Sequence, residues 1–187
     1  MHAGSLEDAE AALAPIREAG PALDAFAPVG YAEFQRSIDD PPGYRNWWTA
    51  EYLDDLGEGA IDAICALADD LPAGPAQIRI PAWGGAVARV PEDATPLAKR
   101  DARFVVHPLL LWEDAAEDDR MIAFGRRYRE VLAPYRTGGA YLNWAAEADA
   151  DRVRAAYGPN HERLVRVKAG WDPDNVFRAT GNVRPGD

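Results

Sequence analysis

Cysteine is scarce in this sequence, with Cys65 as the only one among 187 residues, so an internal disulfide and a cage of several thiolates are both excluded. Long apolar runs are missing as well. The longest uncharged one, from Phe104 to Trp112, contains His107 and Pro108 and falls far short of the roughly 20 residues that cross a bilayer. The first residues, MHAGSLEDAE, offer neither a basic start nor an apolar stretch, so no secretory signal is readable.

Positive charge is also in short supply: 20 Lys and Arg residues face 31 Asp and Glu residues, which leaves a net charge of −11. A protein that binds nucleic acid needs a basic face, and anionic membranes attract basic segments. We therefore expect no nucleic-acid partner and no membrane partner. The low cysteine content and the unreadable leader are typical of a reduced compartment, and we expect a cytoplasmic protein.

Apolar side chains are plentiful, at 48% of the residues with 10% aromatic, and suffice for the core of about one domain. No metal site is expected, because the histidines lack the spacing of ligands and the acidic run from Glu113 to Asp119 lacks the pattern of a calcium loop. His107 is interpreted as a hydrogen-bonded core residue rather than a ligand or a base. Cys65 lies on the apolar face of a predicted helix and is interpreted as a buried small hydrophobe.

Hydrophobic periodicity predicts an α+β fold, with an antiparallel β-sheet flanked by helices. Apolar residues that recur every three or four positions predict helices at residues 5–20, 58–71, 113–133, 149–157 and 159–170. Alternating or continuous apolar residues predict strands at residues 44–52, 77–80, 86–90, 103–112 and 140–144. Glycines separate the second of these strands from the third, which indicates an antiparallel pair.

Two adjacent tryptophans, Trp47 and Trp48, occupy the first predicted strand and therefore point to opposite faces of the sheet. One of them is expected in the core. The other is expected to line either a pocket or an interface, because aromatic rings serve both purposes. Both are candidate substrate-binding residues.

Tyr141 and Asn143 alternate in the last predicted strand, so both are expected on the same face. Gly138 and Gly139 precede them and allow the backbone to approach another group closely. A phenol and a carboxamide beside bare backbone can bind a flat polar ring. The alternative is that both residues are ordinary core or sheet-edge residues with satisfied hydrogen bonds.

The C-terminal third resembles the closing signature of the berberine-bridge-enzyme-like, FAD-linked oxidases. These proteins carry a Y-x-N-[YF] strand, an acidic spacer, and a run that ends in D-P-x-N-x-F-[RH]. The matching residues here are Tyr141-Leu142-Asn143-Trp144, Ala156-Tyr157-Gly158-Pro159-Asn160, Arg163-Leu164, Lys168 and Trp171-Asp172-Pro173-Asp174-Asn175-Val176-Phe177-Arg178. Upstream, RNWWTAEYLDDL, WGGAVARVPEDATPLAKRDARFVV and LLWEDAAEDD are similar to the substrate-domain half of bacterial members, so the resemblance covers most of the chain.

The resemblance implies the fold of vanillyl-alcohol-oxidase-type flavoproteins, in which one domain holds FAD and a second domain lays an antiparallel sheet over the flavin. On that pattern residues 1–137 are a partial substrate-binding domain. Residues 138–187 are the C-terminal berberine-bridge-enzyme-like segment, which returns to the flavin domain. The sheet is expected to be incomplete relative to the full substrate domain of the family.

The same resemblance implies oxidation of an alcohol by hydride transfer to flavin, with FAD as the cofactor. Tyr141 takes the position of the catalytic base that removes the proton of the substrate hydroxyl. Asn143 is expected to face the flavin or to orient that tyrosine, and Asn175 and Asn182 lie in the segment that contacts the flavin domain. The motif does not specify the substrate, since related oxidases act on sugars, alkaloids, polyketides and other alcohols.

The loop that grips FAD in the family, and the histidine or cysteine that links it covalently, have no counterpart in these 187 residues. We therefore expect the chain alone to be inactive, which leaves three interpretations. The chain is the substrate-domain portion of an oxidoreductase that works with a separate flavin-binding domain, a stand-alone module that binds a small molecule, or a self-associating structural protein. In each case we expect an exposed apolar patch on the sheet face and tail, and a loose tail from about residue 177.

Overall fold

The computed structural model describes residues 4–40, 42–179 and 181–186, and its contacts divide the chain into two units, Met1–Pro42 and Gly43–Asp187. The first unit contains two helices, α1 (Leu6–Glu18) and α2 (Tyr31–Ser37). Helix α1 begins as predicted after Ser5, whose hydroxyl oxygen accepts the backbone N–H of Asp8 and satisfies one free donor of the first turn. Neither helix contains a buried residue in the part of the chain described here.

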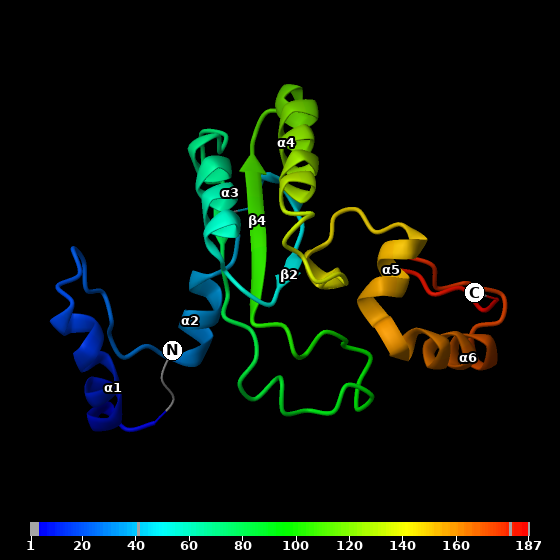
Figure 1. The fold of residues 1–187 in the computed structure, drawn as a ribbon, viewed down its shortest axis with the longest axis horizontal. Helices are drawn as coiled ribbons and strands as arrows, with labels where there is room; N and C mark the ends of the chain where they lie inside the picture. Colours follow the sequence, from blue (N-terminus) through cyan, green and yellow to red (C-terminus); the bar gives the residue numbers. More distant parts are fainter. Residues whose placement is uncertain (1–3, 41, 180, 187) are drawn as a thin grey trace. The chain divides into compact units, whose positions relative to one another are not determined.

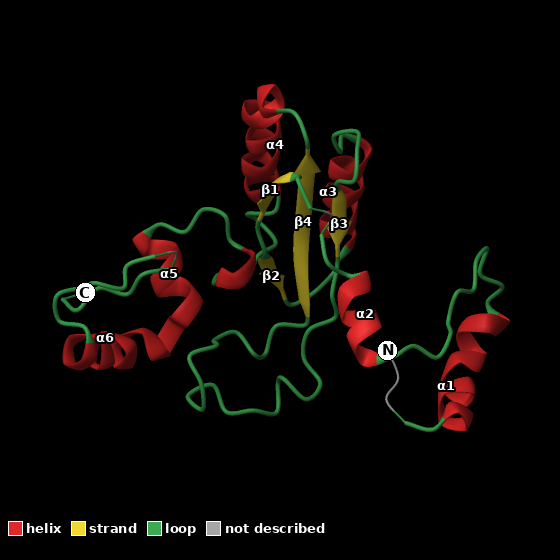
Figure 2. Ribbon diagram, turned by 180° about the vertical axis from the view of Figure 1, so that it is seen from behind, coloured by secondary structure: helices red, strands yellow, loops and turns green. Residues whose placement is uncertain are grey.

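The second unit is built around one long strand, β4 (Phe104–Trp112), which confirms the strand predicted at residues 103–112. Three shorter strands pair with β4 in antiparallel fashion, namely β1 (Arg45–Trp48), β2 (Glu51–Leu53) and β3 (Gln77–Arg79). Figure 2 shows β3 on one side of β4, with β1 and β2 on the other. All residues of β4 after the first are buried, because the strand has neighbours on both edges and other side chains pack against both of its faces.

Strands β1 and β2 lie along the same edge of β4 in one continuous register. The sequence predicts a single strand at residues 44–52, and the structure interrupts it at Thr49 and Ala50. The Thr49 carbonyl oxygen lies 2.7 Å from His107 Nδ1, and the Ala50 carbonyl oxygen accepts Arg152 Nη2 at 3.3 Å. Both carbonyls therefore bind side chains instead of a neighbouring strand.

Four longer helices belong to the same unit: α3 (Glu58–Asp69), α4 (Asp118–Val131), α5 (Ala150–Tyr157) and α6 (His161–Trp171). Short 3₁₀ turns lie at Ala115–Glu117, Leu142–Trp144 and Gly158–Asn160. Each longer helix corresponds to a predicted one. Helix α4 begins later than residue 113 because a 3₁₀ turn occupies part of the acidic run. The architecture is the predicted α+β class, with helices α3 and α4 beside β4 (Figure 1).

The main core lies between the sheet and the two helices α3 and α4. Its largest buried members are Trp47, Leu53, Leu67, Leu110, Met121, Phe124, Tyr128 and Leu132. Trp47 lies directly against α4 at Gly125, where an added Cβ would come within 2.2 Å of the ring atom Cζ3. Glycine at this position is therefore what allows the helix to approach the indole ring so closely. The expectation that one of the two adjacent tryptophans belongs to the core is confirmed for Trp47.

The predicted strands at residues 86–90 and 140–144 are wrong. In the first case Gly84 and Gly85 both have positive φ, and the chain forms a turn in which Val87 N donates to the Gly84 carbonyl oxygen. The partner of β3 is β4, not this segment. In the second case Gly138 and Gly139 also have positive φ, and a 3₁₀ turn follows where a strand was expected. Backbone bends at glycine pairs override the apolar alternation in both segments.

His107 is buried as expected, whereas Cys65 is not. His107 is 1% exposed and its Nδ1 lies 2.7 Å from the Thr49 carbonyl oxygen, which confirms a hydrogen-bonded core residue. Cys65, in contrast, is exposed, so its interpretation as a buried hydrophobe is wrong. Helix α3 buries Ile64 and Leu67, and Cys65 lies outside the narrow stripe that they form.

Candidate functional site

A cluster of aromatic side chains surrounds Tyr141 on the face of the sheet that points away from α3 and α4. Successive residues of β4 alternate between the two faces, and Val105 points to this one. The buried ring of Tyr52, from β2, lies beside Val105. Trp83, Tyr141 and Trp144 pack against this pair and are partly buried. The cluster therefore joins three separate parts of the chain: the sheet, the loop before β4 and the segment after α4.

The rings of this aromatic cluster form a continuous series of contacts. The ring centres of Tyr52 and Trp83 are 5.9 Å apart, and those of Trp83 and Tyr141 are 5.6 Å apart. Tyr141 meets Trp144 edge to face at 5.1 Å, and Trp144 stacks on His107 at 4.4 Å with 17° between the planes. Edge-to-face and offset stacked pairs are the favourable arrangements of aromatic rings. Contacts on several sides therefore hold the Tyr141 ring in a defined orientation.

Asn143 is hydrogen-bonded to Tyr141, with its Nδ2 donating to the phenol oxygen at 3.0 Å. The sequence predicts that these two side chains lie together, and they do. The reason differs from the expected strand alternation, because Asn143 is part of the 3₁₀ turn Leu142–Trp144. The short turn brings the carboxamide back to the phenol two residues earlier.

A hollow of about 500 Å³ opens beside this turn. Its lining residues are Asn46, Trp48, Leu142, Asn143, Ala145, Ala146 and Tyr157. Trp48 is half-buried and contributes to the wall, whereas Trp47 lies in the core and is not among the lining residues. Of the two tryptophans expected to bind substrate, the structure therefore places one beside Asn143. An indole and two carboxamides give the hollow both an apolar wall and hydrogen-bonding groups.

Residues 48–52, which we call the docking strip, bind the segment that carries Tyr141. The carbonyl oxygen of Tyr52 accepts Thr137 N at 2.9 Å, and the carbonyl oxygen of Trp48 accepts Ala146 N at 3.0 Å. These two bonds lie on either side of Tyr141 in the sequence. They fix both ends of the loop that contains it against the interrupted edge of the sheet.

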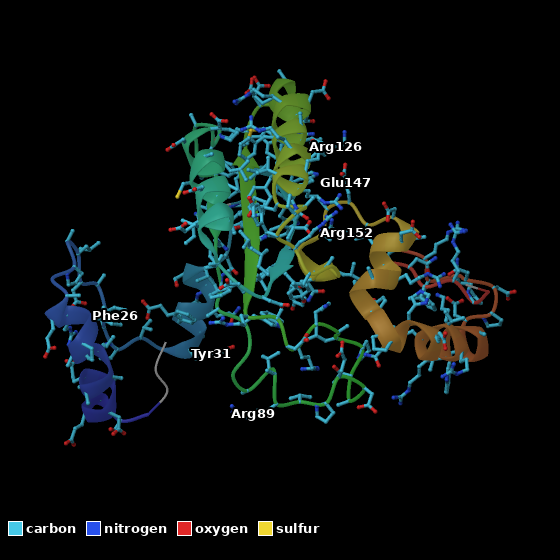
Figure 3. The ribbon with its side chains drawn as sticks, viewed as in Figure 1. Phe26, Tyr31, Arg89, Arg126, Glu147 and Arg152 are labelled. Carbon is cyan, nitrogen blue, oxygen red and sulfur yellow. The ribbon has the colours of Figure 1, made fainter. Side chains whose placement is uncertain are left out.

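Within the docking strip, Glu51 is only 1% exposed and forms ion pairs with three arginines. Its carboxylate lies 3.3 Å from Arg129, 3.4 Å from Arg136 and 3.2 Å from Arg152. Arg152, which belongs to α5 and is labelled in Figure 3, also donates to Thr49 Oγ1 at 2.6 Å. Burial lowers the pKa of Arg152, and the charge of Glu51 opposes that shift.

Sequence reasoning does not identify this ionic cluster. The available signal is an acidic residue inside an apolar strand, since Glu51 stands between Ala50 and Tyr52. A buried carboxylate requires cationic partners. The sequence does not tell which of the many arginines supply them, because all three lie more than 70 residues away in the chain.

The C-terminal tail surrounds a second, mainly apolar groove of about 530 Å³ that Trp171, Phe177 and Asn182 line. Trp171 is 88% and Phe177 is 80% exposed, so the expected apolar patch on the tail is present. Asn182 lines this groove rather than the hollow beside Asn143. Tyr157 lines both, so the groove and the hollow adjoin.

Asp172 holds the first turns of the tail. Its carboxylate accepts the backbone N–H groups of Val176 at 2.7 Å and Phe177 at 3.0 Å, and it forms an ion pair with Lys168. The hydrogen bond from Lys168, helped by those two N–H groups, holds the pKa of Asp172 below its usual value. Asn175, between these contacts, has a positive φ of 51° and a buried Oδ1 without a hydrogen-bond partner among the described residues.

The described residues lack two further features, a cluster of metal ligands and a membrane-crossing helix. No group of histidine, cysteine, aspartate and glutamate side chains there is arranged to hold a metal ion. No helix there combines the length and the apolar character that a membrane crossing requires.

Comparison with known proteins places these residues in context. The family model described as "Berberine and berberine like" matches residues 140–184, the segment that contains Tyr141, Asn143, α5 and α6. The chain is 34% identical over 103 residues to an FAD-linked oxidoreductase of Bacillus subtilis, which is 55% of this chain and 23% of that relative. It is 35% identical over 130 residues to an aclacinomycin oxidase of Streptomyces galilaeus, or 58% and 23% of the two chains.

Solved structures of two oxidoreductases share the fold of this chain. The 6-hydroxy-D-nicotine oxidase of Arthrobacter nicotinovorans superposes with a TM-score of 0.77 at 25% identity, over 98% of this chain and 43% of that one. An aclacinomycin oxidoreductase superposes with a TM-score of 0.71 at 26% identity, over 97% and 42%. The chain spans about a quarter of the length of the curated relatives, at 23% of each. The chain thus carries a berberine-like segment and is homologous to part of the FAD-linked oxidoreductases of the berberine-bridge-enzyme-like family.

Proposed function

We propose that this chain forms the substrate-side portion of an FAD-dependent oxidoreductase that oxidises an alcohol-type substrate, with Tyr141 as the catalytic base. The observation that carries the proposal is the Tyr141–Asn143 pair at the edge of the hollow, within the segment that matches the berberine-like model. On this proposal residues 1–137 are part of a substrate-binding domain and residues 138–187 are the C-terminal segment. A cytoplasmic location belongs to the same proposal.

Tyr141 needs help from its surroundings to act as a base. A phenol ordinarily ionises near pH 10, so its oxygen holds its proton at neutral pH unless hydrogen bonds or charges favour the phenolate. Asn143 supplies one such hydrogen bond, because its Nδ2 donates to that oxygen. The phenolate oxygen would then accept the proton of a substrate hydroxyl held in the hollow. A bound flavin supplies the acceptor for the hydride.

The described residues fit one side of a flavin. The hollow beside Asn143 is open, and Asn46 and Trp48 give it a polar edge and an aromatic wall. Phosphate groups require basic side chains or a helix N-terminus, and the residues that line the hollow include no basic side chain. We therefore propose that a separate flavin-binding domain holds the dinucleotide part of FAD, and that the 187 residues alone show no turnover.

The test follows flavin reduction without oxygen. The chain is mixed with FAD and a panel of alcohols, alone and with the flavin-binding domain of its Bacillus relative supplied separately. We expect bleaching of the oxidised flavin band only with that domain present, and a rate about 10² to 10⁴ lower for Tyr141→Phe. Tyr135→Phe is the control, since Tyr135 lies at the surface beside Gly59. Equal rates for Tyr141→Phe and wild type would exclude Tyr141 as the base.

The second candidate is a self-associating or small-molecule-binding module without redox activity. The exposed rings of Trp171 and Phe177 favour it, because a monomer rarely leaves such a patch uncovered. The flavin experiment separates the two candidates. If the chain is a module without redox activity, no alcohol will bleach the flavin, whether the flavin-binding domain is present or absent. Sedimentation would then report a concentration-dependent dimer that Trp171→Ser weakens.

A further inference from the structure

Four arginines gather around two carboxylates beside helix α4. Three of them form ion pairs with the buried Glu51, and the fourth, Arg126, forms an ion pair with Glu147. The hydrogen bond from Arg126 lowers the pKa of Glu147. The charges of Arg129 and Arg152 lower that pKa further, so both carboxylates share one electrostatic environment. We call these six side chains the arginine cluster: Arg126, Arg129, Arg136, Arg152, Glu51 and Glu147.

The arginine cluster carries more positive than negative charge. Its four guanidinium groups face two carboxylates, which leaves a local excess of two positive charges in a protein whose net charge is −11. A guanidinium keeps its proton in proteins, so the excess is not relieved by deprotonation. Burial lowers the pKa of Arg152, and repulsion from Arg129 and Arg136 lowers it further. A further anion would offset this repulsion.

Hydrogen-bond donors in the arginine cluster also outnumber the acceptors, because each guanidinium has more N–H groups than a carboxylate has oxygens. Arg129 Nε lies 3.3 Å and Arg136 Nη1 lies 3.4 Å from the oxygens of Glu51. Both distances are long for charged pairs, which are commonly about 2.7–2.9 Å. Arg152 is only 8% exposed, and its Nε is buried without a hydrogen-bond partner among the described residues. Native proteins contain few such groups, so the cluster has capacity for another acceptor.

The arginine cluster can be reached from solution and lies away from Tyr141. The side chains of Arg129 and Arg136 are 27% and 36% exposed. Glu51 and Tyr52 are neighbours in β2 and therefore point to opposite faces of the sheet, and the Tyr52 ring belongs to the aromatic cluster around Tyr141. An anion that approaches Arg129 and Arg136 thus meets the other side of the sheet. Figure 3 labels three members of the cluster, Arg126, Glu147 and Arg152.

We propose that the arginine cluster binds a small, doubly charged oxyanion, either a phosphate ester or a dicarboxylate, at the guanidinium groups of Arg129 and Arg136. The charge of such an anion equals the local excess, and its several oxygens can accept N–H groups from both arginines. The site does not depend on the proposed role of Tyr141. The bound anion fastens α4 to the C-terminal segment, because Arg129 of α4 and Arg152 of α5 share the Glu51 carboxylate.

The test uses inorganic phosphate, added to the full chain at constant ionic strength in exchange for chloride. The Nε–H signals of ¹⁵N-labelled arginine are followed by NMR, and we expect a saturable change at Arg129 and Arg136. Arg136→Gln should weaken phosphate binding about tenfold, since a positive charge and a charged hydrogen bond are lost. The matched control is Arg89→Gln, which removes an exposed arginine from the loop before β4 (Figure 3) and should leave the affinity unchanged.

Glu147→Gln makes the opposite change. It removes one negative charge from the arginine cluster and raises the local excess from two to three, so phosphate should bind about two- to fivefold more tightly. The Glu147 side chain is 38% exposed, so this variant should fold and keeps the test decisive if Arg136→Gln does not fold.

Three outcomes overturn the proposal: phosphate has no saturable effect beyond that of chloride, Arg136→Gln binds phosphate as tightly as the wild type does, or Glu147→Gln binds it more weakly. A second titration replaces phosphate with succinate. Tighter binding of phosphate assigns the site to phosphate esters, and tighter binding of succinate assigns it to dicarboxylates. None of these measurements involves flavin, so their failure and the failure of the proposed oxidoreductase function are distinguishable.

Discussion

Gly125 offers the most direct test of how α4 packs on the sheet. Alanine at this position adds a Cβ that would lie 2.2 Å from Cζ3 and 2.3 Å from Cε3 of Trp47, so the indole or the helix must move. Trp47 is only 4% exposed and lies inside the main core, which leaves the ring little room. Overpacking of a core costs about 1–3 kcal/mol. We expect a cost near the upper end of this range, because two ring atoms of Trp47 overlap with the added Cβ. Alanine recovers about 1 kcal/mol of helix propensity, so we expect a net loss of about 2 kcal/mol.

The assay is urea unfolding followed by circular dichroism, with a second glycine as the matched control. Gly170 lies in α6, and an added Cβ there has no atom within 4 Å, so Gly170→Ala should stabilise the protein by about 0.5–1 kcal/mol. In a Trp47→Phe background, which lacks the larger indole ring, Gly125→Ala should cost less by about 1 kcal/mol or more. The reasoning is refuted if Gly125→Ala is as stable as the wild type or gains stability as the control does.

The remaining predictions concern the two ionic contacts that hold the C-terminal third. Arg152→Met removes one of the three arginines that pair with the buried Glu51. The free energy of unfolding in urea should fall by about 3 kcal/mol, the low end for a broken buried ion pair. Arg152→Lys keeps a positive charge and should recover part of that loss. The lowered pKa of Asp172 means that its contribution to stability is present above the unfolded value near 3.9 and disappears as the pH falls through the folded value. The protection of the Val176 and Phe177 amides against hydrogen exchange, relative to their intrinsic rates, should therefore fall below about pH 4. In Asp172→Asn the same two amides should be poorly protected already at about pH 7. Slow exchange in that variant would contradict this account.

The sequence predicts those parts of the fold that short-range patterns determine. The mainly apolar run at residues 103–112 predicts a buried strand, and it forms the centre of the sheet. Helix α1 has its serine cap, and the stripes of α3 to α6 indicate their positions. The pairing of Tyr141 with Asn143 is also predicted, because residues two apart meet both in a strand and in the turn that forms instead.

Long-range contacts and backbone bends are what the sequence does not reveal. Alternation predicts strands at residues 86–90 and 140–144, but the positive φ of the preceding glycines turns the chain in both places. The break between β1 and β2 depends on side chains that approach Thr49 and Ala50 from β4 and α5. The aromatic cluster around Tyr141 likewise forms only when β2 and the loop before β4 meet in space.

The docking strip has a consequence for the order in which the chain folds during synthesis. Residues 48–52 are synthesised well before their partners, because Thr137 follows Tyr52, whose carbonyl it binds, by 85 residues, and Arg152 follows Thr49 by 103 residues. Contacts of such wide sequence separation form late, because a long loop must close first. The sheet edge beside Glu51 therefore stays open, with its carboxylate exposed to water, until its partners Arg129, Arg136 and Arg152 have been made.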